Sequence, residues 1–570
     1  MLKKLFCLLG CLASLQSIRA QEIVQTKTYQ KGVFQYPLDL TPSTAGSFGE
    51  LRANHFHSGL DFRTNRQIGF PVHAAMYGYV SRLRVQLGGF GNAVYLTHPN
   101  GFTSVYAHLD HLTPELAAAV RKYQYEHQSF EVDFKLQPFQ FPVTKGQLIA
   151  ISGNTGASGG PHLHFEIRDS LTEETINPQL FGLTIADNIP PSISGISIYH
   201  LNGKPFSENT FREPYAVTGA SGNYRLTKPQ TLNLSGDIGF GITANDLNNS
   251  SANRNGIYSV ELKLDGRTVY TFAVERFAFD QTHAINGYID YPQFIQYKRW
   301  IQKCFIPPGS RITLYPQNEN RGIISFRDTL LHDVEYLVKD VAGNVSTLKL
   351  KVQSSIPKDK PVVTYSGTKF SYNQRNEFNN AAVKVVVDPG NLYDDLDFKY
   401  STLPQKPGMY SVIHRIHNRL TPIHDHINLW IKPDASIGSL ANKAVIVNTM
   451  RGSMGGKFED GYIKAQPAVF GDYYIKVDTT APRIVPINIS NGANLAAAKS
   501  ISLRASDDLS GLKSVVAKID GKWILLTQDY RTRIYRYTFD ESVSAGKHEF
   551  EVTATDAKDN VSQYRVTFNK

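Results

Sequence analysis

One pattern of residues occurs twice in this chain, and it constrains the fold more than any other feature of the sequence. The first copy lies within residues 244–346 and the second within residues 505–562; both end in a His, an Asp, an Asn, a Val and a Ser at identical spacing. Each copy holds Asp-Gly turns between segments that alternate apolar and polar residues, such as residues 260–264 and 550–554. Alternation of this kind is typical of half-buried strands joined by tight turns. The repeat predicts two immunoglobulin-like β-sandwiches.

The composition agrees with a chain made mainly of strands. Its 570 residues include 43 Gly, 28 Pro, 30 Tyr and 31 Phe, and only 19% of them are charged. This balance excludes a helical bundle, a coiled coil and a disordered chain. At roughly 100 to 200 residues per domain, the length predicts about three to five domains. We therefore expect a mainly all-β protein, with an antiparallel β-sheet domain followed by β-sandwiches.

The first residues have the pattern of a secretory signal. Two lysines precede an apolar run at residues 5–15, which is too short to span a membrane, and Ala20 offers a small residue for cleavage. We expect a signal peptide at residues 1–20 and an exported protein, located in the periplasm or cell envelope or secreted. A lipoprotein signal with Cys11 as the anchor is less favoured, because the apolar core before it is short.

The mature chain keeps one cysteine, Cys304. No intrachain disulfide is then possible, so packing alone must hold the fold, and Cys304 is expected to be a buried small hydrophobic residue. No later segment is apolar for long enough to cross a bilayer. Removal of the signal lowers the net charge from +10 to about +7. This moderate excess favours anionic cell-envelope polymers as partners and does not indicate nucleic-acid binding.

Proline-containing breaks divide the chain into units. They lie at residues 187–191, 355–358 and 478–482, where prolines end regular structure and stiffen a linker. A helix is expected at residues 114–128, because a Thr and a Pro precede a run of good helix formers. The predicted units are an N-terminal domain at residues 21–188 and β-sandwiches at residues 189–356, 357–478 and 479–570.

Histidines mark the N-terminal domain as the place where chemistry is concentrated. Nine of the 17 lie between His55 and His164. His57 and Asp61 form a His-x-x-x-Asp pair, which can offer an imidazole nitrogen and a carboxylate oxygen to one metal ion. Taken alone, a turn with a surface histidine is the simpler interpretation of this pair.

Two further segments place histidines on strands. Residues 162–168 alternate, so that His162, His164 and Glu166 share one face and the apolar residues between them share the other. Two histidines on a solvated face need no metal, but the glycine-rich approach to this strand permits close packing beside a site. His108 follows a Tyr-Ala pair at the end of another strand, where an isolated histidine is more often a core or surface residue.

Together, these segments closely resemble the lysostaphin-like (LytM-type) zinc endopeptidases, a family that cuts peptidoglycan cross-links. The family is defined by His-x-x-x-Asp, a downstream Tyr-Ala-His and a terminal His-x-His. The resemblance covers about residues 35–180, under a third of the chain, and it is specific because several weak motifs coincide in order. The other matching segments are residues 48–52, 69–72, 88–92, 143–147 and 153–156.

The resemblance implies a catalytic zinc site. Its ligands would be His57, Asp61 and His164, with water at the fourth position. His108 and His162 would be catalytic histidines beside them. Zinc lowers the pKa of its water toward 7, so a nearby imidazole can accept the proton while zinc polarises the scissile carbonyl. Which histidine is the general base stays open.

The resemblance implies an active enzyme, because no required position is missing. Its function would be zinc-dependent hydrolysis of peptide bonds in peptidoglycan stem peptides or cross-bridges. One alternative is a cell-envelope scaffold or hydrolase activator that binds peptidoglycan without cutting it, and another is a secreted metallopeptidase that acts on proteins. Asn92 is a weaker candidate for positioning substrate. Residues 109–142 exceed a minimal family domain, and this insertion is a candidate for shaping or covering the cleft.

Two other groups of polar residues have simpler interpretations. The aspartates in Asp340/Asn344 and Asp556/Asn560, at the ends of the repeat copies, are expected to bond their own turns. A calcium role is a less favoured alternative, because the spacing matches no recognised calcium loop. The histidines of the third unit match no tetrahedral metal site, and we expect surface positions on a hairpin. They are His414, His417, His424 and His426.

Overall fold

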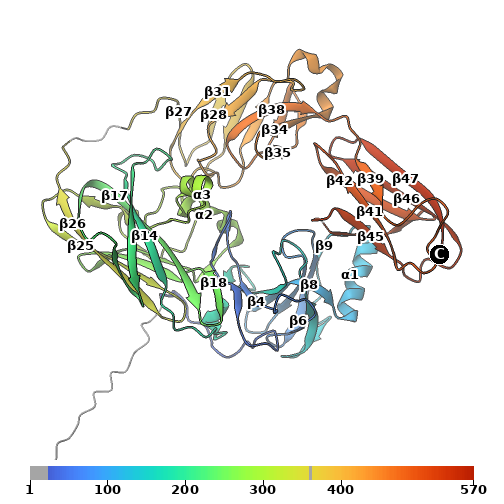
Figure 1. The fold of residues 1–570 in the computed structure, drawn as a ribbon, viewed down its shortest axis with the longest axis horizontal. Helices are drawn as coiled ribbons and strands as arrows, with labels where there is room; N and C mark the ends of the chain where they lie inside the picture. The colour runs from blue at the N-terminus through green and yellow to red at the C-terminus, as the bar shows by residue number, and fades with distance from the viewer. Residues whose placement is uncertain (1–23, 359–362, 530) are drawn as a thin grey trace, which may run out of the picture.

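The computed structural model describes residues 24–358, 363–529 and 531–570, so the predicted signal peptide and Cys11 lie outside the described residues. Strands make up most of the regular structure, which confirms the predicted all-β class. Four β units follow one another around a closed loop, from the first in blue to the last in red (Figure 1). In the described part of the chain, no helix is both long and apolar enough to cross a membrane.

The first unit is built on an antiparallel sheet. Its central path runs β1-β4-β12-β8-β7-β6-β10. In this path β12 (His162–Asp169) lies between β4 (Leu60–Arg63) and β8 (Phe102–Leu112), and its apolar residues are fully buried, as the alternation predicts. The other strands of the unit are β1 (Thr44–Gly46), β2 (Leu51–Arg52), β3 (His55–Phe56), β5 (Pro71–His73), β6 (Gly78–Val85), β7 (Asn92–Thr97), β9 (Val132–Lys135), β10 (Pro142–Val143), β11 (Leu148–Ser152) and β13 (Thr175–Ile176).

One α-helix, α1 (Pro114–His127), interrupts the first unit close to the predicted range. The proline at its first position needs no backbone donor there, and Thr113 occupies the N-cap position without a side-chain capping bond. Leu116 and Val120 are buried on the side that contacts β8 and β9. A short 3₁₀ helix, η1 (Pro178–Phe181), follows β13.

The second unit is built on one sheet, whose central path runs β18-β17-β14-β15-β16-β26-β25-β19-β20-β23. The long strand β17 (Thr231–Asn248) pairs with β26 (Val345–Ser355) through its first residues and with β14 (Ser192–His200) through its later ones. The other elements are β15 (Arg212–Ala220), β16 (Asn223–Leu226), β18 (Ser251–Asn255), β19 (Ser259–Leu264), β20 (Arg267–Ala273), β21 (Arg276–Phe277), η2 (Phe279–Ala284), α2 (Ile285–Tyr288), α3 (Tyr291–Tyr297), β22 (Gln302–Lys303), β23 (Gln317–Asn318), η3 (Asn320–Gly322), β24 (Ile324–Phe326) and β25 (Leu331–Lys339).

The first two units share one hydrophobic core. Across their junction β13 pairs with β21. Phe48 packs on Phe277 with ring centroids 5.1 Å apart, and Phe56 packs on Tyr288 at 5.9 Å. Glu275 accepts several hydrogen bonds from the segment that precedes β1. The linker between these units therefore separates them along the sequence but not in their packing.

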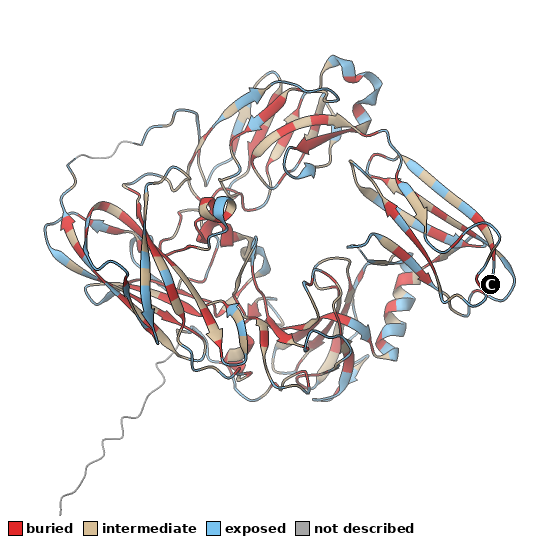
Figure 2. Cartoon of the chain, in the orientation of Figure 1, coloured by how far each residue is buried: buried red, intermediate tan, exposed pale blue. Residues whose placement is uncertain are grey.

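The third and fourth units each have two larger sheets over a separate core, and the third also has the two-stranded sheet β27-β30. The third has sheets β28-β29-β33-β37-β36 and β31-β32-β38-β34-β35; the fourth has β39-β41-β45-β44 and β40-β47-β46-β42-β43. Buried residues follow the strands of both units (Figure 2). The elements of the third unit are β27 (Thr368–Phe370), β28 (Asn376–Asn379), β29 (Val383–Val387), β30 (Leu396–Phe398), β31 (Tyr400–Leu403), β32 (Ile413–Ile416), β33 (Asn428–Ile431), η4 (Ala435–Lys443), β34 (Ala444–Asn448), β35 (Gly452–Ser453), β36 (Lys457–Glu459), β37 (Tyr462–Ala465) and β38 (Gly471–Val477). Those of the fourth are β39 (Arg483–Pro486), β40 (Ala493–Asn494), β41 (Ser500–Ser506), β42 (Leu512–Ile519), β43 (Lys522–Ile524), β44 (Thr527–Asp529), β45 (Ile534–Thr538), β46 (Lys547–Asp556) and β47 (Val561–Asn569).

The fourth unit returns to the first and contacts helix α1 (Figure 1). Arg121 of the helix forms an ion pair with Asp540. Tyr125 meets Trp523 edge to face, with ring centroids 5.1 Å apart. These contacts close the four units into a ring.

We predict that the first unit needs the second for stability but does not need the fourth. A chain that ends at residue 188 exposes Phe48 and Phe56, and each buried phenylalanine contributes about 1.5 to 3 kcal/mol. It should be less soluble, and its first unit should unfold at a lower temperature, than in a chain that ends at residue 478. Soluble yield and calorimetric melting measure both effects. Equal melting of the first unit in the two chains would contradict the shared core.

Candidate metal centre

The register between β4 and β12 brings the predicted ligands together. Asp61 lies directly opposite His164, and His57 lies just before β4. Asp61 Oδ1 is 2.9 Å from His164 Nδ1 and 3.0 Å from His57 Nε2. The two nitrogens are 3.0 Å apart, and all three side chains are buried. Three donor atoms from three separate positions in the sequence therefore meet at one point.

Each of the two histidines is oriented by a hydrogen bond from the ring nitrogen that does not face Asp61. His57 Nδ1 donates to the Ser47 carbonyl at 2.7 Å, and His164 Nε2 donates to Glu166 Oε1 at 2.9 Å. Because a carbonyl and a carboxylate only accept, these bonds leave His57 Nε2 and His164 Nδ1 as the nitrogens that face Asp61. Tetrahedral zinc ligands at 2.0–2.1 Å would lie about 3.3 Å from one another. The donor set and its spacing thus fit zinc.

The charges around the three residues favour a cation. Burial opposes ionisation of Asp61, but His57 and the hydrogen bond from His164 hold its pKa well below the usual range. Burial lowers the pKa of His57 to about 4. Burial also disfavours charge on His164, but Asp61 and Glu166 outweigh it and raise the pKa of His164 to about 9. A metal ion that binds here would replace a proton on His164.

Glu166 is the carboxylate that orients His164. It is fully buried, its Oε1 atom also accepts from Ser58 Oγ, and its Oε2 atom accepts from Arg168 Nε at 2.6 Å. Burial opposes ionisation of Glu166, but Arg168 and His164 lower its pKa to about 2. Arg52 donates to Oδ2 of Asp61 in a similar way. Sequence reasoning placed Glu166 on the correct strand face but missed these supporting contacts.

The two predicted catalytic histidines lie beside the predicted ligands. His108 has a φ of 59° where β8 pairs irregularly with β7 and β11, and its ring lies 4.7 Å from that of His162. Its Nδ1 donates to the Thr155 carbonyl at 2.8 Å, and burial lowers its pKa to about 3, so the ring is neutral. His162 Nδ1 donates to the Gly160 carbonyl at 2.8 Å. Its Nε2 atom lies 3.4 Å from Asp61 Oδ1, with no hydrogen-bond partner among the described residues.

The second unit contributes to the surroundings of these histidines. Phe90 packs on His164 with ring centroids 5.3 Å apart. Phe279, from η2 of the second unit, packs on Phe90 at 6.5 Å and lies 4.3 Å from the guanidinium carbon of Arg168. It keeps 37% of its surface exposed. No sequence motif marked Phe279, because it is remote from the ligands along the chain.

Several predicted supporting residues can now be placed. Asn92 donates its side-chain amide to two backbone carbonyls at the end of β8, so this amide supports the strand. Cys304 is buried and free, as predicted. Asp340 and Asp556 each accept the backbone N–H of the residue four positions later at 2.9 Å, which confirms their predicted turn bonds.

The prediction of surface positions for the histidines of the third unit is wrong. Three of them are buried, and each meets a different hydroxyl group instead of a common metal. Burial lowers the pKa of each of these three to about 4. A neutral imidazole bonded to a hydroxyl can be buried without a charge penalty. The three are His414, His417 and His424; His426 stays partly exposed.

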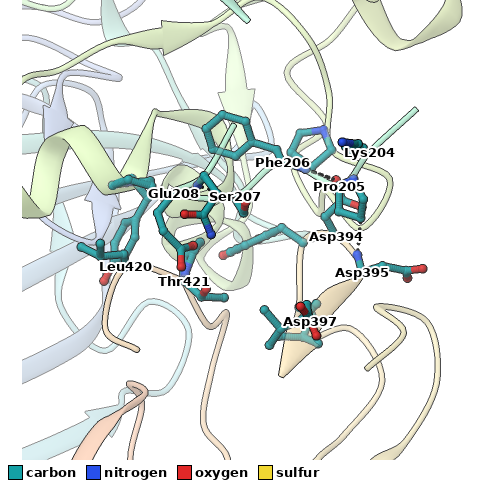
Figure 3. A pocket seen from close by; sticks show the side chains of 18 of the residues that line it. Lys204, Pro205, Phe206, Ser207, Glu208, Asp394, Asp395, Asp397, Leu420 and Thr421 are labelled. Atoms are coloured by element: carbon teal, nitrogen blue, oxygen red, sulfur yellow. Dashed lines mark hydrogen bonds between the residues drawn. The ribbon is translucent and has the colours of Figure 1, made fainter. Parts of the chain in front are cut away.

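A separate cavity of about 330 Å³ lies between the second and third units. The loop at residues 204–208 and the acidic segment at residues 394–397 both face it (Figure 3). The Phe206 amide donates to Asp394 Oδ2 at 3.0 Å. Lys303 also lines the cavity, and burial lowers its pKa to about 8. Of the described residues that line this cavity, none is a predicted metal ligand or catalytic histidine.

Two family models match parts of this chain. The model described as Peptidase family M23 matches residues 55–125 and 122–178, which hold the histidine centre. The model described as a Zu5-like domain matches residues 367–478, which form most of the third unit.

Individual proteins are similar to the first unit. An uncharacterized metalloprotease of Haemophilus influenzae is 30% identical over 179 residues, which cover 30% of this chain and 31% of that protein. The DD-carboxypeptidase/endopeptidase Mpg of Neisseria meningitidis is 31% identical over 128 residues, or 22% of this chain and 23% of that protein. The match thus spans less than a third of these curated relatives. The catalytic domain of lysostaphin from Staphylococcus simulans aligns over 25% of this chain and 91% of its own, at 26% identity and a TM-score of 0.18.

We predict that Glu166→Gln weakens metal binding about 10- to 100-fold, because the ligand histidine loses its charged partner. Zn²⁺ affinity, measured by competition with a chelator, checks this. Glu173→Gln is the matched control, since Glu173 also pairs with Arg168, at 3.2 Å, but its side chain is 59% exposed. The same affinity in both variants, with near-UV circular dichroism unchanged, would contradict the role of Glu166.

Proposed function

We propose that the protein is a zinc-dependent endopeptidase of peptidoglycan, on the premise that residues 55–178 match the model of peptidase family M23. It would hydrolyse peptide bonds in stem peptides or cross-bridges. The observation that carries the proposal is the convergence of two imidazole nitrogens and one carboxylate oxygen within about 3 Å of one another. A relative named peptidoglycan DD-endopeptidase ShyA, from Vibrio cholerae, supports peptidoglycan as the substrate; it is 28% identical over 167 residues, which cover 28% of this chain and 32% of that protein.

The proposal assigns His57, Asp61 and His164 as the zinc ligands, and His108 and His162 as the catalytic residues. Bound zinc would supply a Lewis acid and a water whose pKa is lowered toward 7. His108 and His162 each donate from Nδ1 to a backbone carbonyl, so Nε2 is the atom of each ring that can accept a proton. Such an imidazole can take the proton of the attacking water and then return it to the leaving amine.

We place this activity outside the cytoplasm. The predicted signal peptide directs the chain to the periplasm or cell envelope, where the substrate is found. The excess of positive charge in the mature chain supports contact with anionic envelope polymers.

Digestion of purified peptidoglycan tests the proposed activity. The chain from residue 21 should release new peptide ends, read by mass spectrometry, and both chelation and His164→Ala should abolish the release. His111→Ala is the matched control, because His111 lies on the same sheet with its side chain 65% exposed and should keep full activity.

Each other outcome has a clear meaning. Zinc-loaded protein that binds the polymer but releases nothing would replace the proposal with the scaffold or activator. Cleavage of proteins but not of peptidoglycan would favour a secreted metallopeptidase. Release that survives both chelation and His164→Ala would contradict the metal centre itself.

We also predict that Phe279→Ala raises KM for peptidoglycan fragments about 3- to 10-fold, because removing its apolar surface from beside the centre costs about 1 kcal/mol. Zn²⁺ affinity should not change, since Phe279 contacts no ligand directly. Phe211→Ala is the control, as this residue of the same unit is 64% exposed and packs on His200 instead. Steady-state kinetics give KM for both variants. An unchanged KM in Phe279→Ala would exclude a substrate contact at Phe279.

A further inference from the structure

Three aspartates meet where the first and second units join. Asp187 lies in the linker between the units, Asp246 lies in β17, and Asp340 follows β25. Each can offer one carboxylate oxygen, and these oxygens lie within 4.8 Å of one another. Acidic clusters are common on proteins, so only the groups around this cluster can indicate whether it binds an ion.

Two buried oxygens beside the cluster lack a hydrogen-bond partner within the described ranges. They are Oδ1 of Asp246 and Oδ1 of Asn255, and both side chains are only 5% exposed. The two residues pair across β17 and β18, so their side chains lie on the same face. Together with Asp187 they line a cavity of about 30 Å³, which is large enough for one ion. Buried oxygens without a protein partner are rare, and a bound ion can supply the contact that they lack.

The raised pKa values of the three aspartates also favour a bound cation. Burial, and then the carboxylates of Asp340 and Asp187, raise the pKa of Asp246 to about 9. Burial raises the pKa of Asp187 to about 6 and also raises that of Asp340. A divalent cation between these groups would remove the repulsion and stabilise all three carboxylates in their charged form.

The second copy of the repeat provides an internal comparison. Its corresponding aspartates are Asp478, Asp507 and Asp556. Asp507, the counterpart of Asp246, accepts the backbone N–H groups of Leu509 at 3.1 Å and Gly511 at 2.7 Å. These amides are available because β41 ends at Ser506, whereas β17 continues as a strand past Asp246. Oδ2 of Asp507 thus finds its partners in its own loop.

We propose that Asp187, Asp246, Asp340 and Asn255 form a Ca²⁺ site at the joint between the first and second units. The set offers three carboxylates and an amide oxygen. Calcium takes six to eight oxygen ligands in flexible geometry, whereas zinc prefers nitrogen and sulfur. Backbone carbonyls and water would complete the shell.

The proposed Ca²⁺ site is connected to the histidine centre through Ser47. Ser47 lines the same cavity, and its Oγ atom accepts from the Gly256 amide at 2.8 Å. The carbonyl of Ser47 accepts the 2.7 Å hydrogen bond that orients His57. Calcium would therefore stabilise the loop on which this ligand histidine depends.

Calcium binding to the full mature chain, loaded with Zn²⁺, tests the proposal without any peptidase assay. Isothermal titration should show saturable Ca²⁺ binding that Asp246→Asn weakens at least tenfold. Asp507→Asn is the matched control and should bind as the parent does. Calcium should raise the melting temperature of the parent and of the control by several degrees, but not that of Asp246→Asn.

The calcium-free proteins give a second readout that separates a lost ligand from a damaged fold. Without calcium, Asp246→Asn should melt at or above the parent temperature, because the buried carboxyl must take up a proton at neutral pH, whereas the amide is uncharged. The proposal is overturned if the parent shows no saturable Ca²⁺ binding. It is equally overturned if Asp246→Asn binds as the parent does, or if only Asp507→Asn loses binding.

Discussion

The pairing of β4 with β12 is the constraint on which the histidine centre depends. It sets Asp61 opposite His164 on one face of the sheet, while Leu60 and Phe165 pair beside them and are fully buried. Successive side chains alternate between faces, so a slip of one residue would turn the ligands into the core and the apolar pair out of it. The apolar packing that stabilises this sheet therefore also sets the ligand geometry.

The second unit also helps to fix the loop before β4, which orients His57. Phe48 and Phe56, on either side of the loop's tight turn, both pack against aromatic rings of the second unit. Ser47, beside Phe48, holds the ring of His57 through its carbonyl. With Cys304 as the single free cysteine described, packing and hydrogen bonds must keep this loop in place. The position of the His57 ring therefore depends on the packing at the junction of the first two units.

The family resemblance named the residues that meet at the centre, because His57, Asp61 and His164 lie on short patterns that coincide in order with those of the family. It could not place His108, whose position depends on a left-handed backbone conformation within an irregular ladder. Nor could it find Phe279, which only tertiary packing brings near. The histidines of the third unit were predicted at the surface because their spacing matched no metal site. Hydroxyl partners, which the sequence pattern does not reveal, allow three of them to be buried while neutral.

The contact between helix α1 and the fourth unit has a mechanical consequence. It consists mainly of an ion pair whose arginine is half exposed and one edge-to-face aromatic pair. Each of these interactions stabilises the contact by about 1 kcal/mol. The contact joins parts of the chain that are far apart in sequence, and such closure costs conformational entropy. Domain movements on the microsecond to millisecond scale can break this contact without unfolding a unit. The contact at helix α1 is therefore the point at which the ring of four units can open while each unit stays folded.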